Sequence, residues 1–194
     1  MRVIEAPMAG VHLLEVERRG DARGYFGRCF CRTELEALGV DREIRQGNLS
    51  RSTRAGTLRG LHYQLPPAAE TKIVQCLAGR VYDVVLDLRP TSATFGRHYG
   101  ASLDADNGRM MVVPEGCAHG FLTLTDDCLV HYLVSAEYAP EAERGIRFDD
   151  PAFSIRWPMR PTLVSDRDRA HPPFDPAFHW PCAPGSPTGA EHAA

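Results

Sequence analysis

The chain has 194 residues, enough for one sizeable core and short for two domains. Hydrophobic residues make up 43% of the sequence and charged residues 24%, as in an ordinary soluble globular protein. The net charge of −3 favours neither a nucleic-acid partner nor a membrane surface, and no stretch is long and apolar enough to predict a transmembrane helix.

The N-terminal part predicts strands and one short helix. Residues 1–20 alternate weakly between apolar and polar side chains, which indicates one or two strands. Thr33 has the position of the first residue of a capping box and Gly39 that of a helix stop, so we expect a short helix over residues 34–38. Residues 46–50 are polar and are expected to be extended or looped.

From residue 57 onward, apolar and β-branched runs are separated by turn signals, without helical periodicity. Short strands of this spacing predict an all-β fold, a cupin-type jelly-roll barrel. After it, residues 141–169 look irregular. We expect one cupin-like domain over residues 1–169 and a proline-rich C-terminal extension over residues 170–194 that contributes little to the core and is partly disordered. The predicted strands are 71–77, 81–88, 96–103, 109–113, 119–124 and 128–134.

The stretch Thr57–Pro67 combines leucines with an arginine and a histidine. A half-buried strand whose His62 is simply hydrogen-bonded is the ordinary interpretation. Strict strand alternation places Arg59 and His62 on opposite faces, so both can line one pocket only if the strand bends near Gly60.

The stretch Pro114–Gly120 has the Pro-x-Gly-x-x-His form of the second cupin motif, a tight turn that delivers His119 to the mouth of the barrel. In metal-binding cupins this histidine is a ligand, and a His-x-His pair with a following glutamate completes the site. Around His62 no such trio is present, so we expect a cupin barrel without a metal site. The same turn is equally able to bury His119 against a backbone carbonyl.

Three further residues have an ordinary and a functional interpretation. Alternation places Lys72 on one face with Val74, and Tyr132 on one face with Val130, so both side chains are predicted to point inward. The ordinary interpretations are a lysine that reaches solvent and a tyrosine that only packs. Asp168 lies in a charged run, which usually means a solvated surface.

Together these residues form a set suited to removing a proton next to a carbonyl. His62 is the candidate base, Asp168 orients it, Lys72 stabilises the enolate oxygen, and Tyr132 returns a proton from the other side. A planar, bidentate arginine suits a diphosphate. The candidate diphosphate contacts are Arg23 and Arg59.

The chain resembles the dTDP-4-dehydrorhamnose 3,5-epimerase (RmlC) family over residues 21–168. The most specific of the matching segments is the Leu-Arg-Gly-Leu-His-Tyr-Gln stretch that ends at Gln64. The other matching segments include Asp21–Phe26, Gln46–Asn48, Asp83–Arg89, Ser92–Gly96, Pro114–Phe121, Tyr138–Pro140, Gly145–Pro151 and Ser165–Asp168.

The resemblance implies a metal-free, cofactor-free jelly roll that is usually a homodimer. It also implies epimerisation of dTDP-4-keto-6-deoxyglucose at C3 and C5, on the way to dTDP-L-rhamnose. His62 is then the base, Asp168 its partner, Tyr132 the acid and Lys72 the enolate stabiliser. The positions that match substrate contacts in the family are Arg23, Phe26, Gln46, Asn48, Arg59, His119, Glu143 and Arg167.

The sequence departs from the common family pattern in a few places. Arg28 stands where many members have a substrate-contacting glutamate, Leu133 replaces a lysine, and Arg167 replaces a lysine. Because Arg28 changes the charge expected near the substrate, epimerisation of a single centre is an alternative. A metal-dependent cupin and a non-catalytic sugar-binding cupin are further alternatives.

The location expected from the sequence is the cytoplasm. The N-terminus shows no secretory signal, and the six cysteines lack CxxC spacing. We therefore expect free, mostly buried thiols in a reducing compartment. A small-molecule substrate, a homodimer, and no membrane or nucleic-acid partner complete the expectations.

Overall fold

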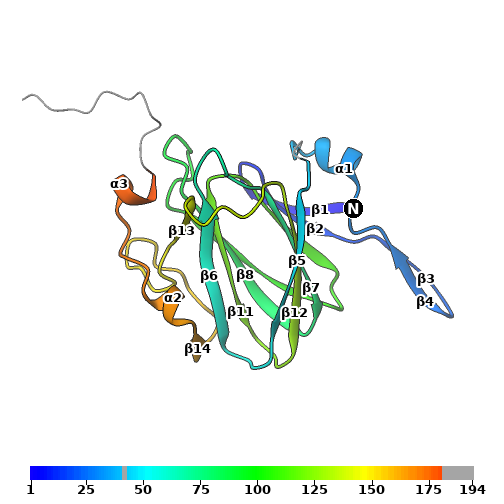
Figure 1. Cartoon of the computed structure of the whole chain (residues 1–194). Coiled ribbons are helices and arrows are strands. Elements are labelled where there is room, and N and C mark those ends of the chain that lie inside the picture. Colours follow the sequence, from blue (N-terminus) through cyan, green and yellow to red (C-terminus); the bar gives the residue numbers. More distant parts are fainter. Residues whose placement is uncertain (41–42, 181–194) are drawn as a thin grey trace, which may run out of the picture.

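The computed structural model describes residues 1–40 and 43–180. Two antiparallel sheets face each other and form a sandwich (Figure 1). In order, the first sheet contains β1 (Arg2–Met8), β2 (Val11–Glu15), β10 (Arg109–Val113), β7 (Lys72–Ala78), β12 (Cys128–Val134) and β5 (Gln46–Ser52). The second contains β13 (Glu143–Gly145), β6 (Thr57–Gln64), β11 (Cys117–Thr123), β8 (Arg80–Asp87) and β9 (His98–Asp104).

The chain passes repeatedly from one sheet to the other between β5 and β13, as in a jelly roll. The short strand β14 (Leu163–Val164) adds to β6 in parallel. Strands β3 (Arg18–Asp21) and β4 (Gly24–Gly27) form a separate hairpin that projects from the sandwich (Figure 1). The all-β, cupin-type prediction is therefore confirmed, with the two sheets stacked as a sandwich.

The predicted strands correspond closely to those observed. Residues 109–113 and 128–134 coincide with β10 and β12, and the other runs differ by one or two residues at their ends. The polar stretch 46–50 lies in β5, an edge strand of the first sheet. Residues 141–169 are mostly irregular, as expected, but contain β13, β14 and helix α2 (Asp166–Arg169).

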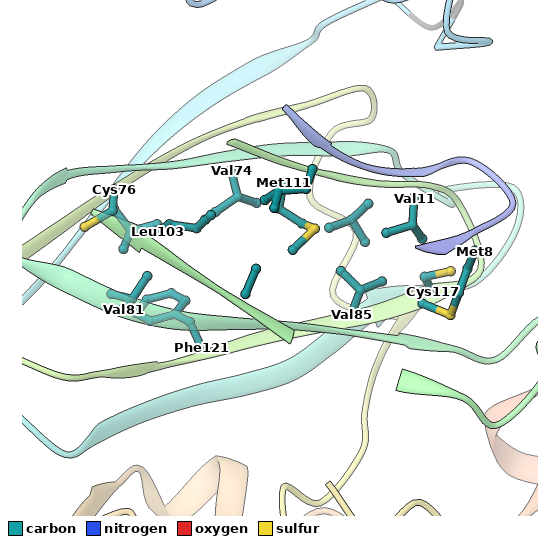
Figure 2. Packing of buried hydrophobic residues seen from close by; sticks show 14 of the residues in the cluster. Met8, Val11, Val74, Cys76, Val81, Val85, Leu103, Met111, Cys117 and Phe121 are labelled. Carbon is teal, nitrogen blue, oxygen red and sulfur yellow. The ribbon is translucent and has the colours of Figure 1, made fainter. Parts of the chain in front are cut away.

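The main core lies between the sheets (Figure 2). In β7, Val74 and Cys76 point into this core, while Ile73 belongs to a second cluster on the outer face. Additional segments cover the outer faces, so both sides of the central strands are buried. Accordingly, β8 and β11 are buried along nearly their whole length.

Helix α1 (Arg32–Glu36) covers part of the outer face of the first sheet through Leu35. It begins two residues before the predicted helix, and its N-cap is Cys31, whose side chain makes no capping bond. The predicted cap at Thr33 is therefore wrong. The Glu34 carboxylate instead binds the N-terminal amino group of Met1, which anchors the first turn in place of a capping box.

The segment 171–180 covers the outer face of the second sheet and includes helix α3 (Pro176–His179). Phe174 and Trp180 pack against this apolar cluster, and His179 is fully buried. The Tyr63 hydroxyl donates to the His179 carbonyl at 2.6 Å. The expectation that residues 170–194 contribute little to the core is therefore wrong for 171–180. Its remaining part, 181–194 with Cys182, lies outside the described residues.

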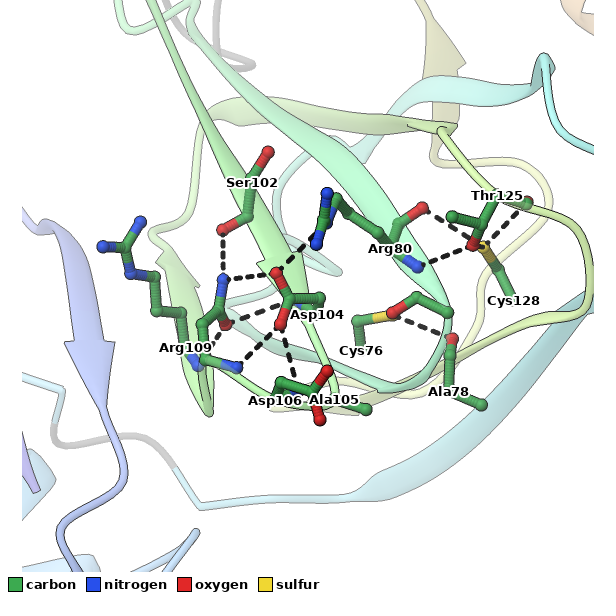
Figure 3. Close-up of polar contacts among 12 residues, drawn as sticks. Cys76, Ala78, Arg80, Ser102, Asp104, Ala105, Asp106, Arg109, Thr125 and Cys128 are labelled. Atoms are coloured by element: carbon green, nitrogen blue, oxygen red, sulfur yellow. Dashed lines mark hydrogen bonds and ion pairs between the residues drawn. The ribbon is translucent and has the colours of Figure 1, made fainter.

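Polar contacts join the ends of β7, β8 and β12 near Ala78 (Figure 3). The Arg80 amide donates to the Thr125 hydroxyl at 3.0 Å, and the Arg80 guanidinium pairs with Asp104 at 3.3 Å. The buried Cys76 and Cys128 thiols donate to backbone carbonyls here. These polar groups satisfy one another's hydrogen bonds, which indicates a structural role.

The five cysteines of the described part are free thiols, as predicted.

None of the helices in residues 1–40 and 43–180 is long and apolar enough to cross a membrane.

Candidate active site

A cavity of about 500 Å³ opens between β6 and β11 of one sheet and β7 and β12 of the other. We call it the Arg59 lobe. It adjoins a second cavity of about 360 Å³, the Gln46 lobe, and the two share His62, Lys72 and Tyr132. Other residues lining the Arg59 lobe include Ser50, His119, Phe121, Ser165, Arg167 and Asp168. The Gln46 lobe is completed by Asn48, Gln64, Glu70, Tyr138 and Glu143, among others.

A bulge in β6 brings Arg59 and His62 to the same cavity. The pairing with β11 moves three residues along β6, from His62 to Arg59, while it moves only two along β11. Gly60 at the bulge has φ +107°, and a Cβ there would lie 2.7 Å from the Gly120 Cα atom. The bend that the sequence required near Gly60 is thus observed.

His62 is bound to the carboxylate of Asp168. The His62 Nε2 atom lies 2.7 Å from Oδ1, and the amide of Gly60 donates to Oδ2 at 3.2 Å. With its Nε2–H donated to Asp168, the imidazole has Nδ1 as the atom that accepts a proton. The hydrogen-bond geometry therefore matches a general base with an orienting carboxylate.

Asp168 is 4% exposed, so the interpretation of its charged run as a solvated surface is wrong. Ser165 is the N-cap of helix α2, and its hydroxyl accepts from the Asp168 amide at 3.0 Å. This short helix aims the carboxylate at β6. Burial acts to raise the pKa of Asp168, but His171 and His62 outweigh it and hold that pKa well below its usual range. The carboxylate therefore remains ionised at neutral pH.

Lys72 and Tyr132 lie on the opposing sheet. Tyr132 packs with the core cluster that contains Val130, which confirms the predicted inward face. Burial raises the pKa of the Tyr132 phenol, so it stays protonated at neutral pH. Lys72 is 9% exposed rather than solvated, and its Nζ atom lies 3.1 Å from Glu70 and 3.3 Å from the His62 carbonyl oxygen.

His119 lines the Arg59 lobe from β11 and pairs with His62 in the sheet. Its Nε2 atom lies 2.8 Å from the fully buried carboxylate of Asp83, so its partner is a side chain and not a backbone carbonyl. In the described residues, the one group of close metal-ligating side chains is His62, Asp168 and His171. His119, the position of the cupin ligand, lies outside that group.

Most of the candidate substrate contacts line one of the two lobes, and Arg23 and Phe26 line neither. Arg59 lines its lobe and is held by Ser52 at 3.1 Å, while Gln46 and Asn48 line the other lobe. Arg167 and Glu143 form an ion pair between the two lobes. Burial acts to raise the pKa of Glu143, but bonds from Tyr138 and Arg167 hold it below its usual value.

Arg23 and Phe26 line neither lobe. They lie on the projecting β3–β4 hairpin, where the Phe26 side chain is 70% exposed. Arg28 also lies away from the two lobes and pairs with Glu34 at 3.1 Å. The charge change at Arg28 is therefore compensated within its own segment.

Two residues at the site were missed by the sequence reasoning. Glu70 lies two residues before Lys72, and strand alternation would have placed both on one face. His171 follows Asp168 by one helical turn and lies 3.7 Å from its carboxylate. Recognising Ser165 as a helix N-cap would have predicted a helical turn after it. Residues three apart on such a turn lie side by side, which would have placed His171 next to Asp168.

The fold and the cavity define a cupin-type jelly-roll enzyme with groups suited to proton transfer. The family model described as dTDP-4-dehydrorhamnose 3,5-epimerase matches residues 5–176. A dTDP-4-dehydrorhamnose 3,5-epimerase of Shigella flexneri is 43% identical over 169 residues, which cover 87% of this chain and 93% of the relative.

Solved structures of sugar-nucleotide epimerases are also similar to this chain. The dTDP-4-dehydrorhamnose 3,5-epimerase of Bacillus anthracis str. Ames, with TDP and PPi bound, superposes with a TM-score of 0.86 at 42% identity, over 89% of this chain and 99% of that one. ChmJ, a 3'-monoepimerase from Streptomyces bikiniensis in complex with dTDP-quinovose, gives a TM-score of 0.81 at 34% identity, over 89% and 87%. The chain belongs to the dTDP-4-dehydrorhamnose 3,5-epimerase family and is an isomerase acting on carbohydrates, as its motifs predicted.

Proposed function

We propose that the enzyme inverts C3 and C5 of a dTDP-4-keto-6-deoxyhexose, using His62 as the base and Tyr132 as the acid. The observation that carries the proposal is that His62 and Tyr132 come from opposing sheets and line the same cavity. Inversion requires a proton to leave one face of the sugar and another to arrive at the opposite face. The family and the TDP bound to the Bacillus anthracis relative support the thymidine nucleotide.

In each half of the reaction, Nδ1 of His62 takes the proton from the carbon next to the 4-keto group. The C–H electron pair forms the enolate, whose oxygen gains the negative charge. An ammonium has three donors, and Lys72 uses two on Glu70 and the His62 carbonyl among the described residues, so one is left for this oxygen. Tyr132 then donates its proton to the opposite face of the sugar. Proton exchange with solvent afterwards removes the proton from His62 and returns one to the Tyr132 phenolate.

Epimerisation of one centre remains the second candidate, because ChmJ, a 3'-monoepimerase, is among the similar structures. Arg28 gives less reason to expect a single inverted centre, because Glu34 pairs with its charge. Incubation with dTDP-4-keto-6-deoxyglucose in D₂O, followed by reduction of the keto group and NMR, tests the proposal. Deuterium and inversion at both carbons support it, and inversion of one carbon at full turnover contradicts it. Loss of activity on chelation would instead indicate a metal-dependent cupin.

Replacing Arg59 with lysine is expected to weaken the binding of free dTDP. Lysine keeps the charge but loses the planar pair of donors that matches a diphosphate, and it loses the bond that orients Arg59 on Ser52. Calorimetry with dTDP measures the effect. Arg51→Lys, which changes an exposed arginine that lines neither lobe, is the matched control. Equal affinity in all three proteins would remove Arg59 from the diphosphate site.

We also propose a cytoplasmic homodimer in which the β3–β4 hairpin of one copy reaches the cavity of the other. Arg23 and Phe26 match substrate-contacting positions, yet within their own chain they lie on an exposed hairpin outside both lobes. Tyr25 and Phe26 are 59% and 70% exposed, which is unusual for large aromatic side chains in a monomer. The nucleotide-sugar substrate and the free thiols of the described part support the cytoplasm.

Mixed dimers test this arrangement. An Arg23→Ala/Phe26→Ala chain and a His62→Asn chain are each expected to be nearly inactive alone. When they are coexpressed, about half of the dimers are mixed, and each mixed dimer holds one intact site if hairpins cross between copies. About a quarter of the wild-type rate should then return. No gain on mixing, with mixed dimers confirmed by two affinity tags, would show that the hairpin serves its own chain or neither site.

A further inference from the structure

A second imidazole, that of His171, lies against the catalytic carboxylate. Its Nε2 atom is 3.7 Å from Oδ1 of Asp168, the same oxygen that binds His62. The rings of His62 and His171 meet edge to face, with centroids 5.7 Å apart. The His171 side chain is 14% exposed, and its buried Nε2 atom has no hydrogen-bond partner among the described residues. A buried, unpartnered polar atom beside an ionised carboxylate calls for a functional explanation.

Gly145 provides the space for this ring. A Cβ atom at Gly145 would lie 2.0 Å from the His171 Nε2 atom, so any side chain there would displace the imidazole. Its φ lies outside the left-handed region, so the glycine is explained by close approach and not by backbone conformation. Gly145 also pairs with His62 in the ladder between β13 and β6. The His171 ring thus rests directly on the strand beside the catalytic base.

The segment that carries His171 is fixed at its other end. His179 Nε2 lies 3.2 Å from the Gly145 carbonyl oxygen, and the His179 carbonyl accepts from the Tyr63 hydroxyl. One contact is made to β13 and the other to β6, which carries His62 and pairs with β13. Residues 171–180 are therefore held against the back of the catalytic strand and keep His171 in place.

We propose that His171 is a positioning residue of the epimerase, holding the Asp168 carboxylate in the orientation that binds His62. The inference rests on the proposed roles of His62 and Asp168. Oδ2 is held by the Gly60 amide, and Oδ1 faces both imidazoles. An Nε2–H group that points at Oδ1 favours the ionised carboxylate and opposes its rotation away from His62. His171 lines neither lobe, so it acts through Asp168 and not on the substrate.

Three substitutions of His171 separate its donor from its bulk. In His171→Phe the ring remains but the donor is lost, and kcat should fall about ten- to a hundredfold, because misplacing a catalytic group by about 1 Å can cost about a hundredfold. KM and the melting temperature should stay near wild type. In His171→Gln an amide N–H replaces the donor, and kcat should largely recover. His171→Leu should resemble His171→Phe and provides a second variant without the donor.

Wild-type kcat in folded His171→Phe or His171→Leu would overturn the proposal. So would a His171→Gln enzyme as slow as His171→Phe, because bulk and not the donor would then matter. Exchange by His62→Asn at the wild-type rate would instead refute the proposed function itself. The two failures are therefore distinguishable.

Gly145→Ala tests the same contact from the other side. Its methyl group should displace the ring and lower kcat to the level of His171→Phe. In a His171→Ala background the methyl group has space, so the double variant should be no slower than His171→Ala alone. Multiplying effects in the double variant, or wild-type kcat in Gly145→Ala, would contradict positioning through this contact.

Discussion

His62→Asn is expected to abolish hydrogen exchange at C3 and C5 while the protein remains folded. Asparagine keeps much of the volume of the histidine side chain, but its amide cannot accept the substrate proton at neutral pH. Loss of a general base costs about a hundred- to ten-thousandfold in rate. The measurement is deuterium incorporation from D₂O into the 4-keto sugar nucleotide, followed by NMR, alongside a melting curve and the affinity for dTDP.

His131→Asn is the matched control for this experiment. His131 is adjacent to Tyr132 in β12, but it lines neither lobe, so its replacement should leave exchange unchanged. Asp168→Asn should retain more activity than His62→Asn, because the carboxylate orients the ring and does not itself accept the substrate proton. Exchange near the wild-type rate in His62→Asn would remove His62 from the mechanism.

Tyr132→Phe is expected to separate exchange from inversion. His62 can still remove a proton and return one to the same face, while Lys72 stabilises the enolate. Deuterium should therefore enter with retention of configuration, and net inversion should fall by about a hundred- to ten-thousandfold without the acid. The second centre should be affected most, because its epimerisation follows the first. NMR of the product, trapped by reduction of the 4-keto group, reports configuration and deuterium content together.

Tyr82→Phe is a suitable control, since Tyr82 packs against Trp157 on the outer face of the second sheet. It should change neither exchange nor inversion. Complete inversion by Tyr132→Phe would require another donor. Tyr138, which lines the Gln46 lobe and donates to Glu143 at 2.6 Å, is then the next candidate, together with an ordered water.

Several features of the site could be predicted from the sequence because they depend on local geometry. Side chains alternate along a strand, so the faces of Lys72 and Tyr132 were predictable from their neighbours alone. The structure confirms both, with Val74 and Val130 packed in the core between the sheets. The lengths of the strands followed from turn signals in the same way.

Other features could not be predicted because they depend on packing between distant segments. The charge run at Asp168 became a buried carboxylate only when α2 docked on β6. The proline-rich segment after residue 169 was expected to contribute little to the core, yet Phe174 packs on an apolar surface of the second sheet. Arg23 was expected at the substrate, but its hairpin projects from the sandwich (Figure 1), and Arg23 lines neither lobe of its own chain.

The residue types, the strand faces and, through the motifs, the family follow from the amino-acid sequence alone. Which of these side chains touch depends on the tertiary fold. His62 and Asp168 are 106 residues apart, and their 2.7 Å contact exists because a bulge at Gly60 turns β6 while α2 packs beside it. Alternation along a strand is set by the backbone of neighbouring residues. A contact between segments is set by register, bulges and packing across the whole fold, which no local pattern contains.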